Sequence, residues 1–139
     1  MSDRRAIAEH LRSVGMDVQQ DVPLSKRGFW RIGGPADLFV TATSVAHVRA
    51  VMSTAEPITV LGNGSNLLVA DAGVRGITLK LAGALRDTRF GQSAAGPWVD
   101  AGAGLLNAPL LARLSKRGLA GLACLAGVPG TVGGAVRMN

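Results

Sequence analysis

An α+β fold is predicted, with short helices packed against a mixed or mostly antiparallel sheet. Short runs of aliphatic and β-branched residues alternate along the chain with segments whose apolar residues recur at helical spacing. Of the 139 residues, 47% are hydrophobic, 17% are charged and 19 are glycine, which is typical of a compact domain that needs no disulfides. No repeat of fixed period and no linker interrupts the chain, so we expect one unit over residues 1–139.

A surface helix is predicted over residues 2–14. Ser2 can cap its first turn and Gly15 can end it. Its apolar face would consist of Ile7, Leu11 and Val14.

A strand and a second helix follow. Residues 37–42 (DLFVTA) are typical of a strand, and Ser44 is placed to cap the helix after it. The buried face of this helix would consist of Val45, Val48, Val51 and Met52.

Short strands dominate the middle of the chain, with a turn at residues 71–73. We expect strands at residues 58–61, 67–69, 76–81 and 98–101. A third helix follows, closed by a basic last turn and by Gly118, and the remainder is expected to be rich in loops. The apolar stripe of that helix would consist of Leu106, Leu110, Leu111 and Leu114.

The formal net charge of +6 indicates attraction to anions. Because the basic residues are scattered pairs with few aromatics among them, nucleic-acid binding is a weak alternative. Gly118–Val136 carries no formal charge, but its six glycines and Pro129 argue against a membrane span. Cys124 has no His or Cys companion at metal-ligand spacing, and the first residues lack the apolar stretch of a secretory signal. We expect a cytoplasmic protein without a metal site.

A glycine-rich loop at residues 62–66 (GNGSN) is the strongest local signal. Two glycines one residue apart let the backbone turn sharply, and successive N–H groups can then form an anion-binding nest. The Ser65 hydroxyl and the amides of Asn63 and Asn66 can add hydrogen bonds. Neither the P-loop nor the Rossmann template fits, because the following residues do not open a helix. Taken alone, such a cluster is more often a hairpin turn.

A second glycine-rich segment, residues 127–134 (GVPGTVGG), is too apolar for an ordinary exposed turn. Two interpretations remain open. The glycines can let the backbone approach a flat aromatic ligand such as a flavin ring, or they can form a tight packing corner between two backbones.

Four motifs, in order along nearly the whole chain, resemble those of the UDP-N-acetylenolpyruvoylglucosamine reductase family. They are residues 31–36 (RIGGPA), 61–66 (LGNGSN), 102–104 (GAG) and 126–139 (AGVPGTVGGAVRMN). The resemblance implies the PCMH-type FAD-binding fold shared with vanillyl-alcohol oxidase-like enzymes. It also implies two small α+β subdomains, about residues 1–56 and 57–139, the second one incomplete.

By position, the resemblance implies that residues 62–66 hold the FAD pyrophosphate and that residues 128–134 lie along the ribityl chain and isoalloxazine ring. The implied cofactor-binding residues are Leu61, Gly62, Asn63, Gly64, Ser65, Asn66, Leu67, Val128, Pro129, Gly130, Val132, Gly133, Gly134 and Asn139. The motif at residues 31–36 is expected to support the cofactor loop. Phe29-Trp30 and Ala123 depart from the family pattern, where Thr-rich sequence and an acidic residue are common.

The family reaction implied is the NADPH-dependent, flavin-mediated reduction of UDP-N-acetylglucosamine enolpyruvate to UDP-N-acetylmuramate in peptidoglycan synthesis. The family's active-site arginine, serine and glutamate have no counterpart before residue 139, so no catalytic residue is assigned and the substrate-binding domain is expected to be absent. His10 and His47 fit solvated helix positions rather than acid–base roles. The alternative is a non-catalytic module that keeps the fold and binds a nucleotide or a partner protein.

Overall fold

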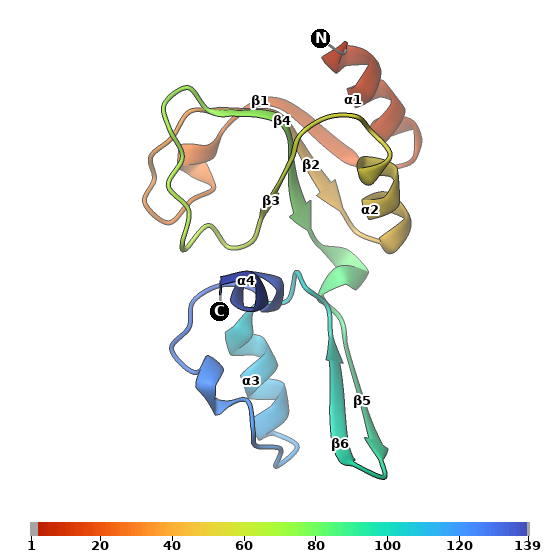
Figure 1. The fold of residues 1–139 in the computed structure, drawn as a ribbon, viewed down its shortest axis with the longest axis vertical. Coiled ribbons are helices and arrows are strands. Elements are labelled where there is room, and N and C mark those ends of the chain that lie inside the picture. The colour runs from red at the N-terminus through yellow and green to blue at the C-terminus, as the bar shows by residue number, and fades with distance from the viewer. Residues whose placement is uncertain (1–2, 139) are drawn as a thin grey trace.

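A computed structural model describes residues 3–138, whose strands form two sheets (Figure 1). The larger sheet has the order β1-β2-β4-β3. Its strands are β1 (Asp17–Pro23), β2 (Pro35–Ala42), β3 (Ile58–Leu61) and β4 (Val74–Leu81). β1 pairs with β2 in antiparallel fashion, whereas β4 runs parallel to both β2 and β3. The expected α+β class with a mixed sheet is therefore confirmed.

Helices α1 (Arg4–Ser13) and α2 (Val45–Met52) cover one face of this sheet (Figure 1). Leu11 of α1 and Val51 of α2 are fully buried there against Leu38, Val40 and Ile77 of the strands. Packing of the two apolar stripes onto one sheet face forms the main core.

The ends of α1 differ in part from the prediction. The N-cap is Asp3, whose carboxylate accepts a hydrogen bond from the Arg5 N–H at 2.9 Å, while Ser2 lies outside the described residues. Gly15 follows the helix with φ +85°, as expected of a glycine that ends a helix. Ile7 packs on the core, but Val14 is 43% exposed because it lies beyond the last helical residue.

The prediction for α2 is confirmed at its cap and wrong at its flanks. Ser44 Oγ accepts a hydrogen bond from the His47 N–H at 3.2 Å. Val48 and Val51 face the core, but Val45 and Met52 are 58% and 64% exposed. At about 100° per residue these two side chains lie at the edge of the apolar stripe, where the sheet does not reach.

Residues 67–69, predicted as a strand, form an extended connection without strand pairing. Leu67 and Val69 pack against the second core cluster, which explains the apolar pattern without a sheet. Strand β1 was not predicted, because Val18 and Val22 stand four residues apart among polar residues.

The remaining strands, β5 (Thr88–Ser93) and β6 (Gly96–Ala101), form a separate hairpin. Helices α3 (Asn107–Ser115) and α4 (Val132–Met138) lie beside it in the lower part of Figure 1. Leu110 and Leu114 of α3 are buried as predicted, but Leu106 precedes the helix and is 40% exposed. Neither β5 nor α4 was predicted, and α4 begins inside the segment expected to be loop. Single 3₁₀ turns occupy Leu24–Lys26, Gly83–Arg86 and Ala123–Leu125.

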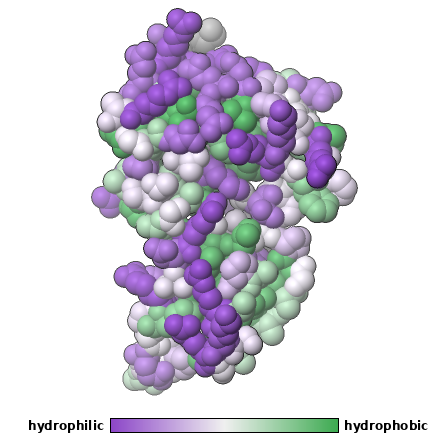
Figure 2. All heavy atoms as spheres, turned by 180° about the vertical axis from the view of Figure 1, so that it is seen from behind, coloured by the Kyte–Doolittle hydropathy of each residue, from purple (hydrophilic) through white to green (hydrophobic). Residues whose placement is uncertain are grey.

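Sheet pairing divides the chain after β4. β3 and β4 are hydrogen-bonded into the same sheet as β2, so a division near residue 56 does not coincide with a boundary between sheets. Seen from behind, hydrophilic residues cover much of the upper part of the molecule and continue down its middle, with groups of hydrophobic residues beside them in the lower part (Figure 2). Among residues 3–138, no helix has the length and hydropathy needed to cross a bilayer.

Candidate functional site

The first glycine-rich loop, residues 62–66, begins at the carboxyl end of strand β3. Leu61 is 4% exposed and Leu67 is half-buried, and both pack in the second core cluster. Their side chains therefore anchor the two ends of the loop, and the cofactor contact that the resemblance implies for these two residues stays a prediction. Ligands of parallel sheets commonly bind beyond the carboxyl ends of the strands, which is where this loop lies.

The backbone amides of residues 63–66 follow one another through the first glycine-rich loop. In the described part of the chain, none of these four N–H groups donates a hydrogen bond to protein. Gly64 is buried with φ +68°, and its carbonyl accepts a hydrogen bond from the Phe29 N–H at 3.0 Å. A Cβ at Gly64 would stand 2.9 Å from the Arg27 carbonyl oxygen and from the Gly28 Cα. Four consecutive free amides on a left-handed turn suit an anion, so the anion-binding nest expected from the sequence stays a prediction that this geometry allows.

The second glycine-rich segment meets the first directly, between the sheet and α4 in Figure 1. Ser65 Oγ donates a hydrogen bond to the Pro129 carbonyl at 3.2 Å, across 64 residues of sequence. A Cβ at Gly62 would stand 2.9 Å from Thr131 Oγ1, so only glycine fits there without a shift. The Ser65 hydroxyl thus joins the two segments, whereas the sequence suggested that it would bind phosphate.

Asn107 supports the second segment from below, a role the sequence did not reveal. It is 1% exposed; its side-chain amide donates to the Val128 carbonyl at 3.1 Å, and its backbone N–H donates to the Gly130 carbonyl at 3.0 Å. Its Oδ1 atom is buried without a hydrogen-bond partner. The only signal available beforehand was a lone amide side chain amid leucines at the start of a helix.

The end of the second segment is a packing corner. The Gly133 N–H donates to the Ala103 carbonyl at 2.9 Å, and a Cβ at Gly133 would stand 3.0 Å from the Ala103 Cβ. Val132 packs in the third core cluster, and the Gly134 N–H donates to Thr131 Oγ1 at 3.2 Å. Of the two interpretations left open, close approach of two backbones explains Gly133. Asn139 lies outside the described residues.

The motif at residues 31–36 has the supporting geometry expected of it. The Gly34 N–H donates to the Ala70 carbonyl at 3.0 Å, and a Cβ at Gly33 would stand 2.6 Å from the Val69 Cβ. The motif therefore packs against the connection that leaves the glycine loop.

Basic side chains lie beside the glycine loop. Lys80 Nζ donates a hydrogen bond to the Gly62 carbonyl. Burial lowers the pKa of Lys80 from 10.5, and the nearby charges of Arg86 and Arg27 lower it further.

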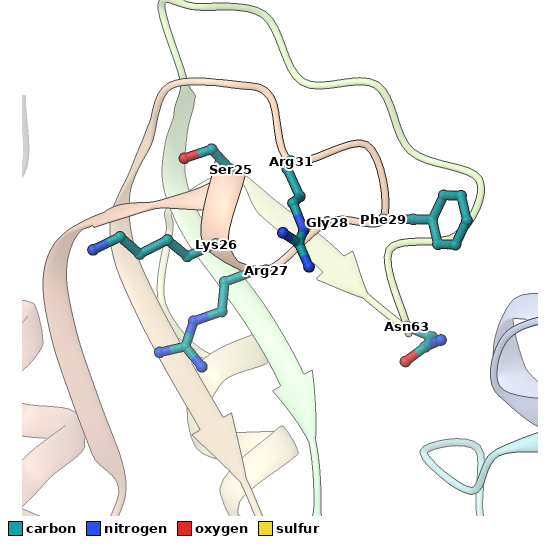
Figure 3. Close-up of a pocket in the computed structure, with 7 residues that line it drawn as sticks. All are labelled: Ser25, Lys26, Arg27, Gly28, Phe29, Arg31 and Asn63. Atoms are coloured by element: carbon teal, nitrogen blue, oxygen red, sulfur yellow. The ribbon is translucent and has the colours of Figure 1, made fainter.

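An open cavity of about 550 Å³ lies beside the loop (Figure 3). Arg31 extends into this cavity, and Asn63 of the glycine loop lies across from it (Figure 3). Arg31 has φ +55°, which is uncommon for a residue other than glycine. The cavity is lined by Ser25, Lys26, Arg27, Gly28, Phe29, Arg31 and Asn63.

The chain belongs to the FAD binding domain family, whose model matches residues 36–139. Membership of this family is consistent with the free amides of residues 63–66, because the diphosphate of FAD is the kind of anion that such a loop can accommodate.

Within that class, the chain is similar to UDP-N-acetylenolpyruvoylglucosamine reductases. It is 44% identical over 137 residues to the reductase of Anaeromyxobacter sp. (strain Fw109-5), covering 95% of this chain and 42% of the relative. It is 42% identical over 132 residues to that of Bacillus subtilis (strain 168), covering 92% of this chain and 42% of the relative. The crystal structure of UDP-N-acetylenolpyruvylglucosamine reductase from Thermus caldophilus superposes with a TM-score of 0.69 at 36% identity, covering 87% of this chain and 41% of that one. The resemblance and the fold are thereby confirmed, and the chain spans about two-fifths of the length of these relatives.

Proposed function

We propose that this chain is the FAD-binding part of a cytoplasmic reductase that uses NADPH to convert UDP-N-acetylglucosamine enolpyruvate to UDP-N-acetylmuramate in peptidoglycan synthesis. The observation that supports this most is the junction of the two glycine-rich segments. Four free amides stand at residues 63–66, and the Ser65–Pro129 hydrogen bond holds the second segment against them.

In this proposal the amides of residues 63–66 bind the cofactor diphosphate. Residues 128–130 then border the ribityl chain and the flavin ring, held in place by the two hydrogen bonds from Asn107. Gly62, Gly133 and Gly134 act indirectly, because their small size lets the two segments and the Ala103 turn come together. We assign no acid or base to this chain, and the UDP-sugar would be bound by the remainder of the reductase.

When bound, FAD supplies the hydride chemistry, and the protein supplies binding, orientation and electrostatics. Free N–H groups on a loop whose two ends are packed in the core would bind the diphosphate with little reorganisation. The left-handed turn at Gly64 sets the direction of these N–H groups. The side chains of Leu61 and Leu67, packed in the second core cluster, hold the two ends of that turn.

The test is a titration of the chain with FAD, followed by flavin fluorescence and by thermal unfolding. Saturable binding should raise the unfolding temperature, since FAD at about 100 times Kd contributes about 2.7 kcal/mol of linked stabilisation. A folded chain that does not bind FAD would contradict the proposal. Binding of ADP but not of FAD would favour the nucleotide-binding module instead.

Gly64→Val should abolish FAD binding, because a branched side chain opposes φ +68° and meets the Arg27 and Gly28 backbone. Gly118→Val is the matched control, since Gly118 has φ +65° but has no other atoms within 4 Å of an added Cβ. Both variants introduce similar strain, and only the first changes the loop. Loss of FAD binding in both variants would mean that strain alone, and not the loop, is responsible.

A further inference from the structure

Lys80 stands on the face of the large sheet that the helices do not cover. Ile77 and Leu79 of β4 lie in the core cluster under α1 and α2, so the alternation of a strand turns Thr78 and Lys80 to the opposite face. Lys80 is paired in register with Leu61, the last residue of β3 before the glycine loop. The sheet thereby places its ammonium group directly beneath that loop.

The contact of Lys80 with the loop sets the direction of an amide. Its Nζ donates to the Gly62 carbonyl. The carbonyl of Gly62 and the N–H of Asn63 belong to one trans peptide unit, so they point in opposite directions. By holding the carbonyl toward the sheet, Lys80 turns the Asn63 N–H away from it, as the first of the four free amides.

The charge around Lys80 is not balanced by acids. Arg27 and Arg86 lie close enough for their charges to act on Lys80. Within residues 3–138, no carboxylate forms an ion pair with any of these three cations. Thr78 Oγ1, two residues earlier on the same face, is buried without a hydrogen-bond partner. Three cations gathered without a carboxylate repel one another, and a bound polyanion relieves that repulsion.

We propose that Lys80 is a positioning residue for the cofactor diphosphate: it orients the glycine loop through the Gly62 carbonyl and, with Arg27 and Arg86, supplies the positive charge beneath it. This inference rests on the proposed function. It assigns part of the diphosphate affinity to a strand residue that contacts the loop from the side of the sheet.

The experiment compares FAD binding by the wild-type chain, Lys80→Met and Lys80→Arg, with Lys116→Met as control. Lys116 is exposed at the end of α3, so its replacement removes the same charge far from the loop. Inorganic pyrophosphate serves as the second probe, in competition with FAD. We expect Lys80→Met to weaken both ligands about ten-fold, as for the loss of one charge-assisted hydrogen bond, and Lys116→Met to change neither by more than about two-fold.

Two readouts separate positioning by charge from simple structural support. The Kd of FAD should depend less steeply on salt in Lys80→Met than in wild type, and Lys80→Arg should restore affinity to within about three-fold. If Lys80→Met does not fold, Lys80→Gln replaces it: the charge is removed while an amide donor remains, so we expect the same flattening of the salt dependence with a smaller loss of affinity.

Three results would overturn the inference: equal affinities in wild type and Lys80→Met, an equal loss in Lys116→Met, or a loss with unchanged salt dependence that arginine does not restore. If the wild-type chain itself fails to bind FAD, the proposed function fails. If wild type binds FAD and Lys80→Met binds equally well, only this inference fails.

Discussion

Asp37 of β2 links this strand to β4 and to helix α1, and its removal should destabilise the fold strongly. Its side chain is 7% exposed and lies 3.1 Å from an Arg4 nitrogen of α1 and 2.7 Å from an Arg75 nitrogen of β4. It also accepts a hydrogen bond from the buried Gly76 N–H at 3.2 Å. The register of β2 against β4 shifts beside it, between Ala36 and Leu38, and at this shift the Gly76 N–H is bonded by the Asp37 carboxylate.

Asp37→Ala leaves the Gly76 N–H buried without an acceptor, which costs about 1 to 3 kcal/mol. The two arginines are 49% and 62% exposed, so each lost ion pair adds only about 0.5 kcal/mol. The free energy of unfolding should fall by about 3 kcal/mol, equivalent to about 10 °C in Tm for a domain of this size. Asp37→Asn keeps an acceptor for Gly76 and should lose about 1 kcal/mol.

The assay is thermal and urea unfolding followed by circular dichroism, with Asp100→Ala as the matched control. Asp100 pairs with Arg89 on the exposed hairpin, and its side chain is 53% exposed, so its loss should change Tm by no more than about 2 °C. If Asp37→Ala unfolds within about 2 °C of wild type, or no lower than Asp100→Ala, the assignment of Asp37 as a buried link is refuted.

Three further predictions follow from the site. The pKa of Lys80 is lowered by burial and by Arg86 and Arg27, so the unfolded chain binds more protons between that lowered pKa and 10.5. The free energy of unfolding of the wild type should therefore rise with pH across this window relative to that of Lys80→Met. Over the same window the wild type should bind FAD less tightly, because Lys80 loses its charge. Parallel curves of Tm against pH for the two proteins would contradict the lowered pKa of Lys80. Asn107→Asp places a carboxylate against the Val128 carbonyl. The free energy of unfolding, measured with urea, should fall by about 3 kcal/mol at pH 7 and by less at pH 4. Gly34→Ala should lower the free energy of unfolding by about 2 kcal/mol, because the added Cβ would overlap the Asp71 carbonyl. Gly28→Ala is the control: the nearest atom to its added Cβ is 3.7 Å away, so the free energy of unfolding should hardly change in the same assay.

Elements with a local cause were predictable from the sequence. The Ser44 cap, the strands at β2, β3 and β4, and the left-handed turn at Gly64 depend on residues close together in the chain. Elements that depend on residues far away in the sequence could not be predicted from it. β1 has a weak pattern of its own and forms because β2 offers it an antiparallel edge. Leu67–Val69 has a strand-like pattern but packs on the second core cluster instead of pairing.

The same division holds for the site. By itself, the sequence determined the two glycine-rich segments, their order and their resemblance to a flavoprotein family, because small residues and turn chemistry act on the nearby backbone. Only the tertiary structure decided what each residue faces. It brought Ser65 to the Pro129 carbonyl, turned Gly133 toward Ala103, and placed Lys80 beneath the Gly62 carbonyl. These contacts join residues that are far apart in the chain, and they depend on strand register and helix packing, which local sequence does not encode.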